Sequence, residues 1–210
     1  MKNSAQLFNL IFITSILQLL SLSVQAQIFG EKWEHGTYYT PEGKISTGLI
    51  AKSPRAKAPD KSEDYILFKT DSVSEKQWIP SSSLKSFTVI NANSKIDSFT
   101  VSKATVLSRP GFIKVLLDTH TKIYSAFIGR VYDTPTMTPN GLLPGTSGPA
   151  LEYLFGTSPN SLFEFGRETF IDVMCIAMAD KPVVIKAIKK KQFKFNELNA
   201  LIEYYKNAPK

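Results

Sequence analysis

The spacing of apolar residues changes from about two to about 3.6 near residue 166, and this change constrains the fold most strongly. Before it, short β-prone runs alternate with turns rich in Gly, Pro, Asn and Ser. After it, apolar residues recur at helical spacing. Strands first and helices last predict an α+β fold, with an antiparallel β-rich sheet or partly open barrel of about 8–10 short strands followed by C-terminal helices.

Two hairpins are the clearest local predictions. Residues 36–51 hold two β-prone runs around a Pro-Glu-Gly turn at 41–43, where Pro presets φ and Gly accepts a positive φ. Residues 112–117 and 122–128 are apolar, β-branched and aromatic, and they flank a polar turn that contains His120. Further short strands are predicted at 65–69, 76–79, 86–90, 99–101, 105–107, 151–155 and 162–165.

Two helices are predicted directly after the change of period. Thr169 and Asp172 have the spacing of a capping box for a helix over 170–178. Pro182 is suited to the first turn of a second helix, which runs to about Lys191.

A third helix is predicted over 197–206, with Asn196 as its N-cap. Its apolar residues share one face, so we expect the helix to lie against the sheet. These residues are Leu198, Leu201, Ile202 and Tyr205.

The N-terminus has the layout of a secretory signal peptide. Lys2 precedes an apolar run over 10–22, and small residues at Val24 and Ala26 suit cleavage after Ala26. An uncleaved anchor is the alternative, but the run is short for a membrane span. The predicted organisation is a signal peptide (1–26), a β-rich domain (27–166) and a helical segment (167–210). The mature chain is expected to be exported, periplasmic or extracellular, without a transmembrane segment.

The chain is basic, with a formal net charge of +7. Such an excess favours anionic surfaces, such as acidic glycans or lipid headgroups. Near the C-terminus, lysines alternate with apolar residues at helical spacing. The simplest interpretation is that these lysines form the solvated face of a helix, and the alternative is a ligand-binding patch. These lysines are Lys186, Lys189, Lys190, Lys191 and Lys194. No nucleic-acid-binding motif is present, so nucleic acid is not expected as a partner.

Residues 132–149 are dense in Pro and Gly and predict a long loop without regular structure. Loops of that length are often functional or else disordered. The candidate binding residues in it are Tyr132, Met137, Asn140, Leu142 and Leu143.

Candidate catalytic residues are few. Gly145-Thr146-Ser147-Gly148-Pro149 resembles the nucleophile segment of chymotrypsin-like proteases, although a residue that the pattern has between Gly148 and Pro149 is missing. His35 precedes Ser147 in the required order and is the candidate base. The same residue types also serve ordinary loop turns, and the sequence favours that interpretation.

Cysteine and metal chemistry have little support in the sequence. Cys175 is the single cysteine, so it cannot form an intramolecular disulfide, and its apolar surroundings predict a small buried side chain. His35 and His120 are far apart and offer none of the short ligand spacings of zinc sites. No metal and no cofactor is therefore predicted.

Seven short segments of the mature chain share a pattern with one group of proteins. The segments are 36–39, 42–45, 48–50, 79–80, 84–87, 122–124 and 201–207. Together they resemble uncharacterised exported α+β proteins of Bacteroidota. The resemblance spreads over most of the mature chain but leaves out the segment after Tyr132, and it implies no assigned activity.

The sequence thus predicts a non-enzymatic interaction module of the cell envelope, whose partner is a protein or an anionic glycan or lipid surface. It would bind through the sheet face, an exposed edge or the 132–149 segment. A serine hydrolase using Ser147 and His35 is the alternative, and a purely structural role is a third possibility.

Overall fold

The computed structural model describes residues 31–52, 58–131, 136–138, 141–143 and 147–209. The predicted signal peptide lies outside these residues. The chain divides into two units, Met1–Trp33 and Glu34–Lys210, and every element named below belongs to the second. Within the described residues, no helix is long and apolar enough to cross a membrane.

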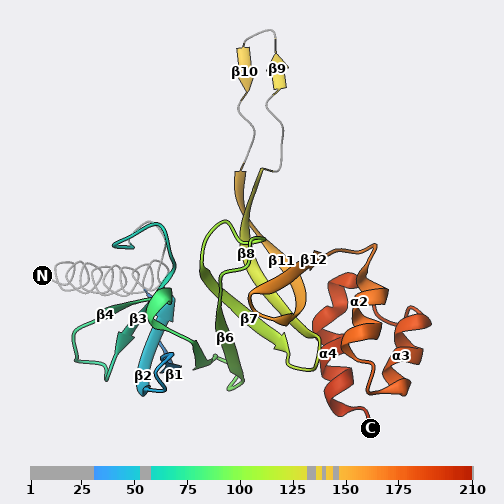
Figure 1. The fold of residues 1–210 in the computed structure, drawn as a ribbon, viewed down its shortest axis with the longest axis horizontal. Helices are drawn as coiled ribbons and strands as arrows, with labels where there is room; N and C mark the ends of the chain where they lie inside the picture. The colour runs from blue at the N-terminus through green and yellow to red at the C-terminus, as the bar shows by residue number, and fades with distance from the viewer. Residues whose placement is uncertain (1–30, 53–57, 132–135, 139–140, 144–146, 210) are drawn as a thin grey trace, which may run out of the picture. The chain divides into compact units, whose positions relative to one another are not determined.

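The second unit is built on one open antiparallel sheet of ten strands in the described part of the chain (Figure 1). The strands are β1 (Glu34–Tyr39), β2 (Ile45–Lys52), β3 (Tyr65–Lys69), β4 (Gln77–Pro80), β5 (Ser86–Ile90), β6 (Ile96–Ser102), β7 (Gly111–Leu117), β8 (Lys122–Val131), β11 (Ser147–Ser158) and β12 (Ser161–Phe165). Their order is β12-β11-β8-β7-β6-β5-β1-β2-β3-β4. The predicted α+β fold, strands first and helices last, is confirmed.

The first hairpin forms as its turn chemistry predicts. β1 pairs with β2 from Glu34 opposite Ile50 to Tyr39 opposite Ile45. Gly43 has a φ of 88°, which glycine adopts without steric cost, and its N–H donates to the carbonyl of Thr40 at 3.1 Å. The predicted turn at 41–43 therefore sets the register of β1 and β2.

One predicted strand is wrong: residues 105–107 form a turn, in which Leu107 N–H donates to the carbonyl of Ala104 at 3.0 Å. Ser102, the last residue of β6, is bound to a distant part of the chain, because its buried hydroxyl donates to the carbonyl of Pro159 at 2.5 Å. This bond ties the end of β6 to the β11–β12 turn, so the chain turns instead of extending a strand.

The helices lie close to the predicted ranges. They are η2 (Ser81–Ser83), α2 (Phe170–Ala177), α3 (Pro182–Lys189), η3 (Phe195–Glu197) and α4 (Leu198–Asn207). Pro182 is the first residue of α3, as its missing N–H favours.

Of the two predicted N-caps, one position is correct and one is wrong. Thr169 is the N-cap residue of α2, as predicted, but its side chain makes no capping bond and instead accepts a hydrogen bond from Gly166 N–H at 3.3 Å. The prediction of Asn196 as the N-cap of α4 is wrong, because Glu197 holds that position. Asn196 lies inside η3, where the Glu197 carboxylate accepts from Lys194 N–H at 2.8 Å. Capping requires a particular backbone turn before the helix, and spacing alone does not reveal that turn.

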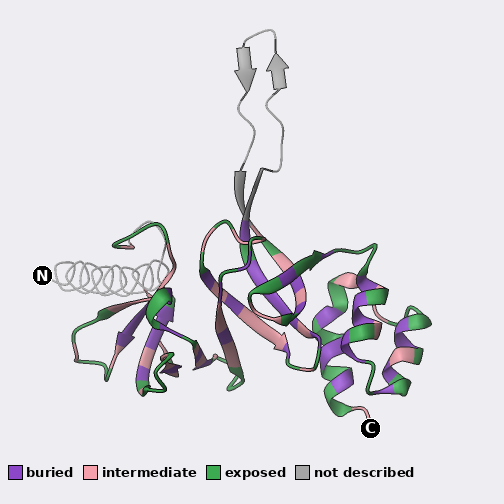
Figure 2. Cartoon of the chain, viewed as in Figure 1, coloured by how far each residue is buried: buried purple, intermediate pink, exposed green. Residues whose placement is uncertain are grey.

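The helices pack against one end of the sheet in a shared apolar core. Leu117 of β7, Ile123 of β8 and Phe165 of β12 belong to the same buried cluster as the inner faces of α2, α3 and α4. The predicted inner face of α4 is confirmed, and Figure 2 shows buried and exposed residues alternating along each helix. Its buried residues are Leu198, Leu201, Ile202 and Tyr205.

The buried Lys181 fastens the end of α4 to the start of α3. Its Nζ donates to the carbonyls of Tyr205 and Ala208 at 2.6 and 2.7 Å and lies 4.6 Å from the centre of the Tyr205 ring. The Tyr205 hydroxyl in turn contacts both carboxylate oxygens of Asp180 at 2.9 and 3.0 Å. Cations favour the C-terminal carbonyls of a helix, so this lysine stabilises the helical segment.

Candidate functional site

The β8 and β11 strands form the longest ladder of the sheet. They pair without interruption from Lys122 opposite Gly156 to Val131 opposite Ser147. Successive side chains along each strand alternate between the two faces of the sheet. We call these two strands the β8–β11 pair; its unbroken register fixes which residues share a face.

One face of the β8–β11 pair begins under the helices. Ile123 of β8 is opposite Phe155 of β11, and Tyr153 is opposite Phe165 of β12. The Tyr153 ring lies edge-on to Phe195 of η3, with centroids 5.4 Å apart. This part of the face is therefore covered by the C-terminal helical segment.

The same face continues beyond the helices to Phe127 and Leu151, which are directly opposite each other. Leu151 is two residues from Tyr153 and Phe127 is four from Ile123, so alternation keeps them on the helix-bearing face. Yet Phe127 is 61% exposed and Leu151 is 51% exposed. We call these two residues the exposed Phe127–Leu151 pair. Adjacent exposed apolar side chains on a rigid ladder are typical of an interaction surface.

The segment between β8 and β11 is more regular than the predicted loop. β9 (Thr136–Thr138) and β10 (Gly141–Leu143) pair antiparallel, with Met137 opposite Leu142. In addition, Ser147–Pro149 belong to β11. The prediction of a loop without regular structure over 132–149 was therefore wrong, because cross-strand pairing overrides a local excess of Pro and Gly.

The candidate binding residues of this segment fall into two groups. Met137, Leu142 and Leu143 are strand residues of β9 and β10. Tyr132 and Asn140 lie outside the described residues. Leu143 is opposite Thr136 and Gly141 is opposite Thr138, which defines the register of β9 and β10.

Ser147 and His35 are not brought together on neighbouring strands. Ser147 is the first residue of β11, and His35 is an exposed residue of β1. Four strands, β8, β7, β6 and β5, lie between β11 and β1 in the sheet. A serine and its general base need hydrogen-bond contact of about 3 Å, which this arrangement of strands does not favour.

Cys175 is partly buried on α2, against the core that the helices share with the sheet. Burial raises the pKa of its thiol, an effect that Lys189 opposes and Asp172 reinforces. A raised pKa keeps the thiol protonated, whereas catalytic cysteines have lowered values. Among the residues that the structure describes, no group of three or more His, Cys, Asp or Glu side chains could hold a metal.

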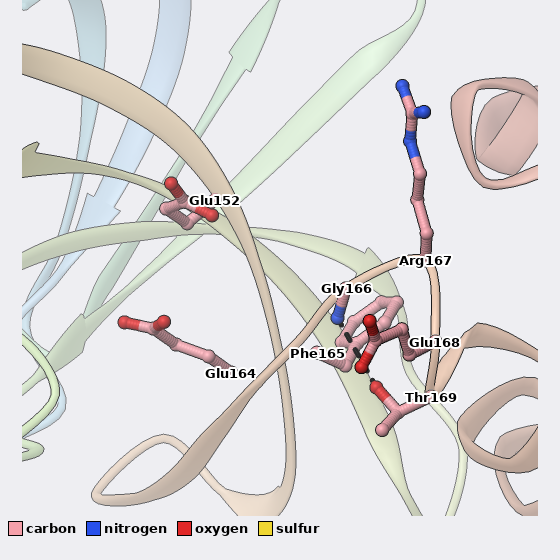
Figure 3. A pocket seen from close by; sticks show the side chains of 7 residues that line it. All are labelled: Glu152, Glu164, Phe165, Gly166, Arg167, Glu168 and Thr169. Atoms are coloured by element: carbon pink, nitrogen blue, oxygen red, sulfur yellow. Dashed lines mark hydrogen bonds between the residues drawn. The ribbon is translucent and has the colours of Figure 1, made fainter. Parts of the chain in front are cut away.

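An open groove of about 570 Å³ lies between β11, β12 and the start of α2, and the sequence did not indicate it (Figure 3). Three glutamates from different parts of the chain line it, and within the lining the Gly166 N–H donates to the Thr169 hydroxyl at 3.3 Å. The lining residues are Glu152, Glu164, Phe165, Gly166, Arg167, Glu168 and Thr169. Its charged lining contrasts with the apolar Phe127–Leu151 pair, with which it shares only the strand β11.

The C-terminal lysines are exposed, as predicted for a solvated helix face. The helical segment also has two exposed apolar residues, Ile176 of α2 and Val183 of α3. The exposed lysines are Lys186, Lys189, Lys190, Lys191 and Lys194.

A scan against protein-family models, a search of curated proteins and a search of solved structures each found no match to this chain. The resemblance to exported proteins of Bacteroidota therefore stays a prediction from the sequence. The candidate site rests on the geometry of the chain itself.

Proposed function

We propose that this protein is a non-enzymatic binding module of the cell envelope, which attaches to a protein partner through the exposed Phe127–Leu151 pair. The observation that carries the proposal is the exposure of both side chains on one continuous ladder, on the same face as Ile123, which is buried under the helices, and Phe155, which is partly buried there. Interfaces are enriched in aromatic anchors of this kind.

The energetics favour a partner at this position. Complete burial of a Phe or Leu side chain contributes about 1.5–3 kcal/mol relative to an exposed one. The two side chains are held side by side by backbone pairing, so binding costs little ordering of the chain. Because β8 and β11 are inner strands of the sheet, the Phe127–Leu151 pair stays in place when a partner binds.

Export supports an envelope location for the partner. The N-terminal pattern of Lys2, an apolar run over 10–22 and small residues before Gln27 is that of a signal peptide. A folded module that acts outside the cytoplasm would meet its partner in the periplasm or beyond the cell.

A site-specific photocrosslinker tests the proposed surface. Benzoylphenylalanine placed at Leu151 in producing cells is expected to give one crosslinked species, identified by mass spectrometry. The matched control is the same probe at Ile45 of β2, which is 63% exposed on another part of the sheet. Crosslinks at Ile45 that equal those at Leu151 would mean that the Phe127–Leu151 pair is not a specific surface.

An anionic glycan or lipid surface is the second candidate partner, favoured by the exposed C-terminal lysines. Its test is sedimentation with anionic vesicles. Binding that disappears in a Lys189→Glu, Lys190→Glu variant but survives Phe127→Ser would assign the function to the lysines instead.

The serine hydrolase alternative has a direct test as well. A fluorophosphonate probe that labels the wild-type protein but not Ser147→Ala would establish it. The binding-module proposal expects no labelling of either protein.

A further inference from the structure

Ser125 of β8 is a buried residue whose hydroxyl has no protein partner. Only 8% of the residue is exposed, and its hydroxyl makes no hydrogen bond with any residue that the structure describes. The other buried serines of the described chain are bonded. Ser81 donates to Glu63 Oε2 at 3.0 Å, and Ser102 donates to the carbonyl of Pro159. A buried donor without an acceptor lowers stability, so Ser125 needs a partner from outside the chain.

Ser125 lies on the helix-bearing face, in the row of residues next to the Phe127–Leu151 pair. It is directly opposite Lys114 of β7 on one side and Tyr153 of β11 on the other. Alternation along β8 places Ser125 and Phe127 on the same side of the sheet, about 7 Å apart along the strand. Because serine is short and both of its neighbours in the row are long, its hydroxyl lies deeper in this face than they do.

Lys114 places a positive charge beside this hydroxyl. Its Nζ is 2.8 Å from Asp97 Oδ1, and its side chain is 36% exposed. An ammonium group has three protons to donate, and the Asp97 carboxylate accepts one of them while it holds the lysine in place. Ser125 and Lys114 therefore present hydrogen-bond donors next to each other. The group that fits both is an acceptor, and the positive charge favours an anionic one, such as a carboxylate.

We propose that Ser125 and Lys114 bind the carboxylate of an aspartate or glutamate of the protein partner, beside an apolar partner residue that lies on the Phe127–Leu151 pair. This inference rests on the proposed function and adds the chemistry of the partner segment. In an extended segment, residues two positions apart face the same side and are about 7 Å apart, which matches the spacing of Ser125 and Phe127. Charged contacts next to an apolar centre give an interface its specificity.

Photocrosslinking from benzoylphenylalanine at Leu151 in producing cells tests the two residues. Lys114→Gln and Ser125→Ala should each reduce the crosslinked species about tenfold, because each removes a hydrogen bond to a charged group. Lys114→Arg keeps the charge and should retain the crosslink. The matched control is Lys122→Gln, since Lys122 of β8 is also paired with a carboxylate and its side chain is 32% exposed, but alternation places it on the opposite face. Urea midpoints close to that of the wild type show that the variants are folded.

The outcomes separate this inference from the proposed function. Undiminished crosslinking in a folded Lys114→Gln or Ser125→Ala variant would overturn the inference and leave the Phe127–Leu151 pair as the binding surface. The absence of any crosslinked species at Leu151 in the otherwise wild-type chain would overturn the proposed function, and the inference with it. Mass spectrometry of the crosslinked partner peptide is a second test, which needs no variant. It is expected to show an aspartate or glutamate within a few residues of the crosslinked position, and a peptide without one would also overturn the inference.

Discussion

The two ends of one sheet face, on the β8–β11 pair, have the same kind of residues and opposite surroundings. At one end Ile123 and Phe155 lie in or against the core that the C-terminal helices share with the sheet. At the other end Phe127 and Leu151 have the same cross-strand geometry but are exposed. The extent of the helices along this face therefore determines which of its apolar residues are buried in the core and which are available to a partner.

The largest effect is expected at the covered end. Ile123→Ala should lower the free energy of unfolding by about 2–5 kcal/mol, because Ile123 is fully buried and its truncation leaves a cavity. Urea unfolding followed by circular dichroism measures this change. A loss similar to that of Phe127→Ala would mean that the two ends do not differ in burial.

Substitution of Gly156 tests how closely β11 and β12 approach each other at the covered end. A Cβ at Gly156 would lie 2.1 Å from the backbone carbonyl oxygen of Ser161, so Gly156→Ala should destabilise the fold by about 1–3 kcal/mol. Gly166→Ala is the matched control, because a Cβ there meets nothing within 4 Å. Thermal unfolding of both variants should separate them clearly, and equal melting temperatures would refute the close contact of these strands.

Substitution of Lys181 tests what stabilises the helical segment that covers this end of the sheet face. Lys181→Met keeps the approximate length of the side chain but removes the charged donor from the carbonyls of Tyr205 and of the C-cap residue Ala208, which costs about 1–3 kcal/mol. Lys186→Met, at an exposed position of α3, should stay within about 0.5 kcal/mol of the wild type. The midpoints of urea unfolding of the two variants are compared. An unchanged midpoint for Lys181→Met would show that the hydrogen bonds of Lys181 contribute no stability.

The smallest effect on stability is expected at the exposed end. Phe127→Ser and Leu151→Ser should each change the free energy of unfolding by no more than about 0.5 kcal/mol, because both side chains already contact water. The same unfolding measurement applies. A loss of several kcal/mol would mean that the pair is part of the core and not a binding surface.

Much of the fold could be predicted from the sequence where local chemistry dominates. The positive φ of Gly43 and the one-sided apolar pattern of α4 were sufficient for the first hairpin and the last helix. The prediction failed where long-range contacts decide. Residues 105–107 form a turn after the end of β6, where the Ser102 hydroxyl is bound to the carbonyl of Pro159. The strands at 136–138 and 141–143 depend on pairing with each other.

The candidate site was harder to predict than the fold. Both 122–128 and 151–155 were predicted as strands, but their pattern does not distinguish the covered Ile123 from the exposed Phe127. That distinction depends on how far the helices reach along the sheet, which no local pattern contains.

The most direct test of the account compares two exposed cross-strand pairs of the same sheet. Ile90 of β5 is opposite Ile96 of β6, and these residues are 49% and 69% exposed. Partner retention by tagged chains, quantified by crosslinking and mass spectrometry, should be lost in Phe127→Ser, Leu151→Ser and preserved in Ile90→Ser, Ile96→Ser. Retention that survives the first double variant, or is lost equally in both, would contradict the claim that the Phe127–Leu151 pair is the binding surface.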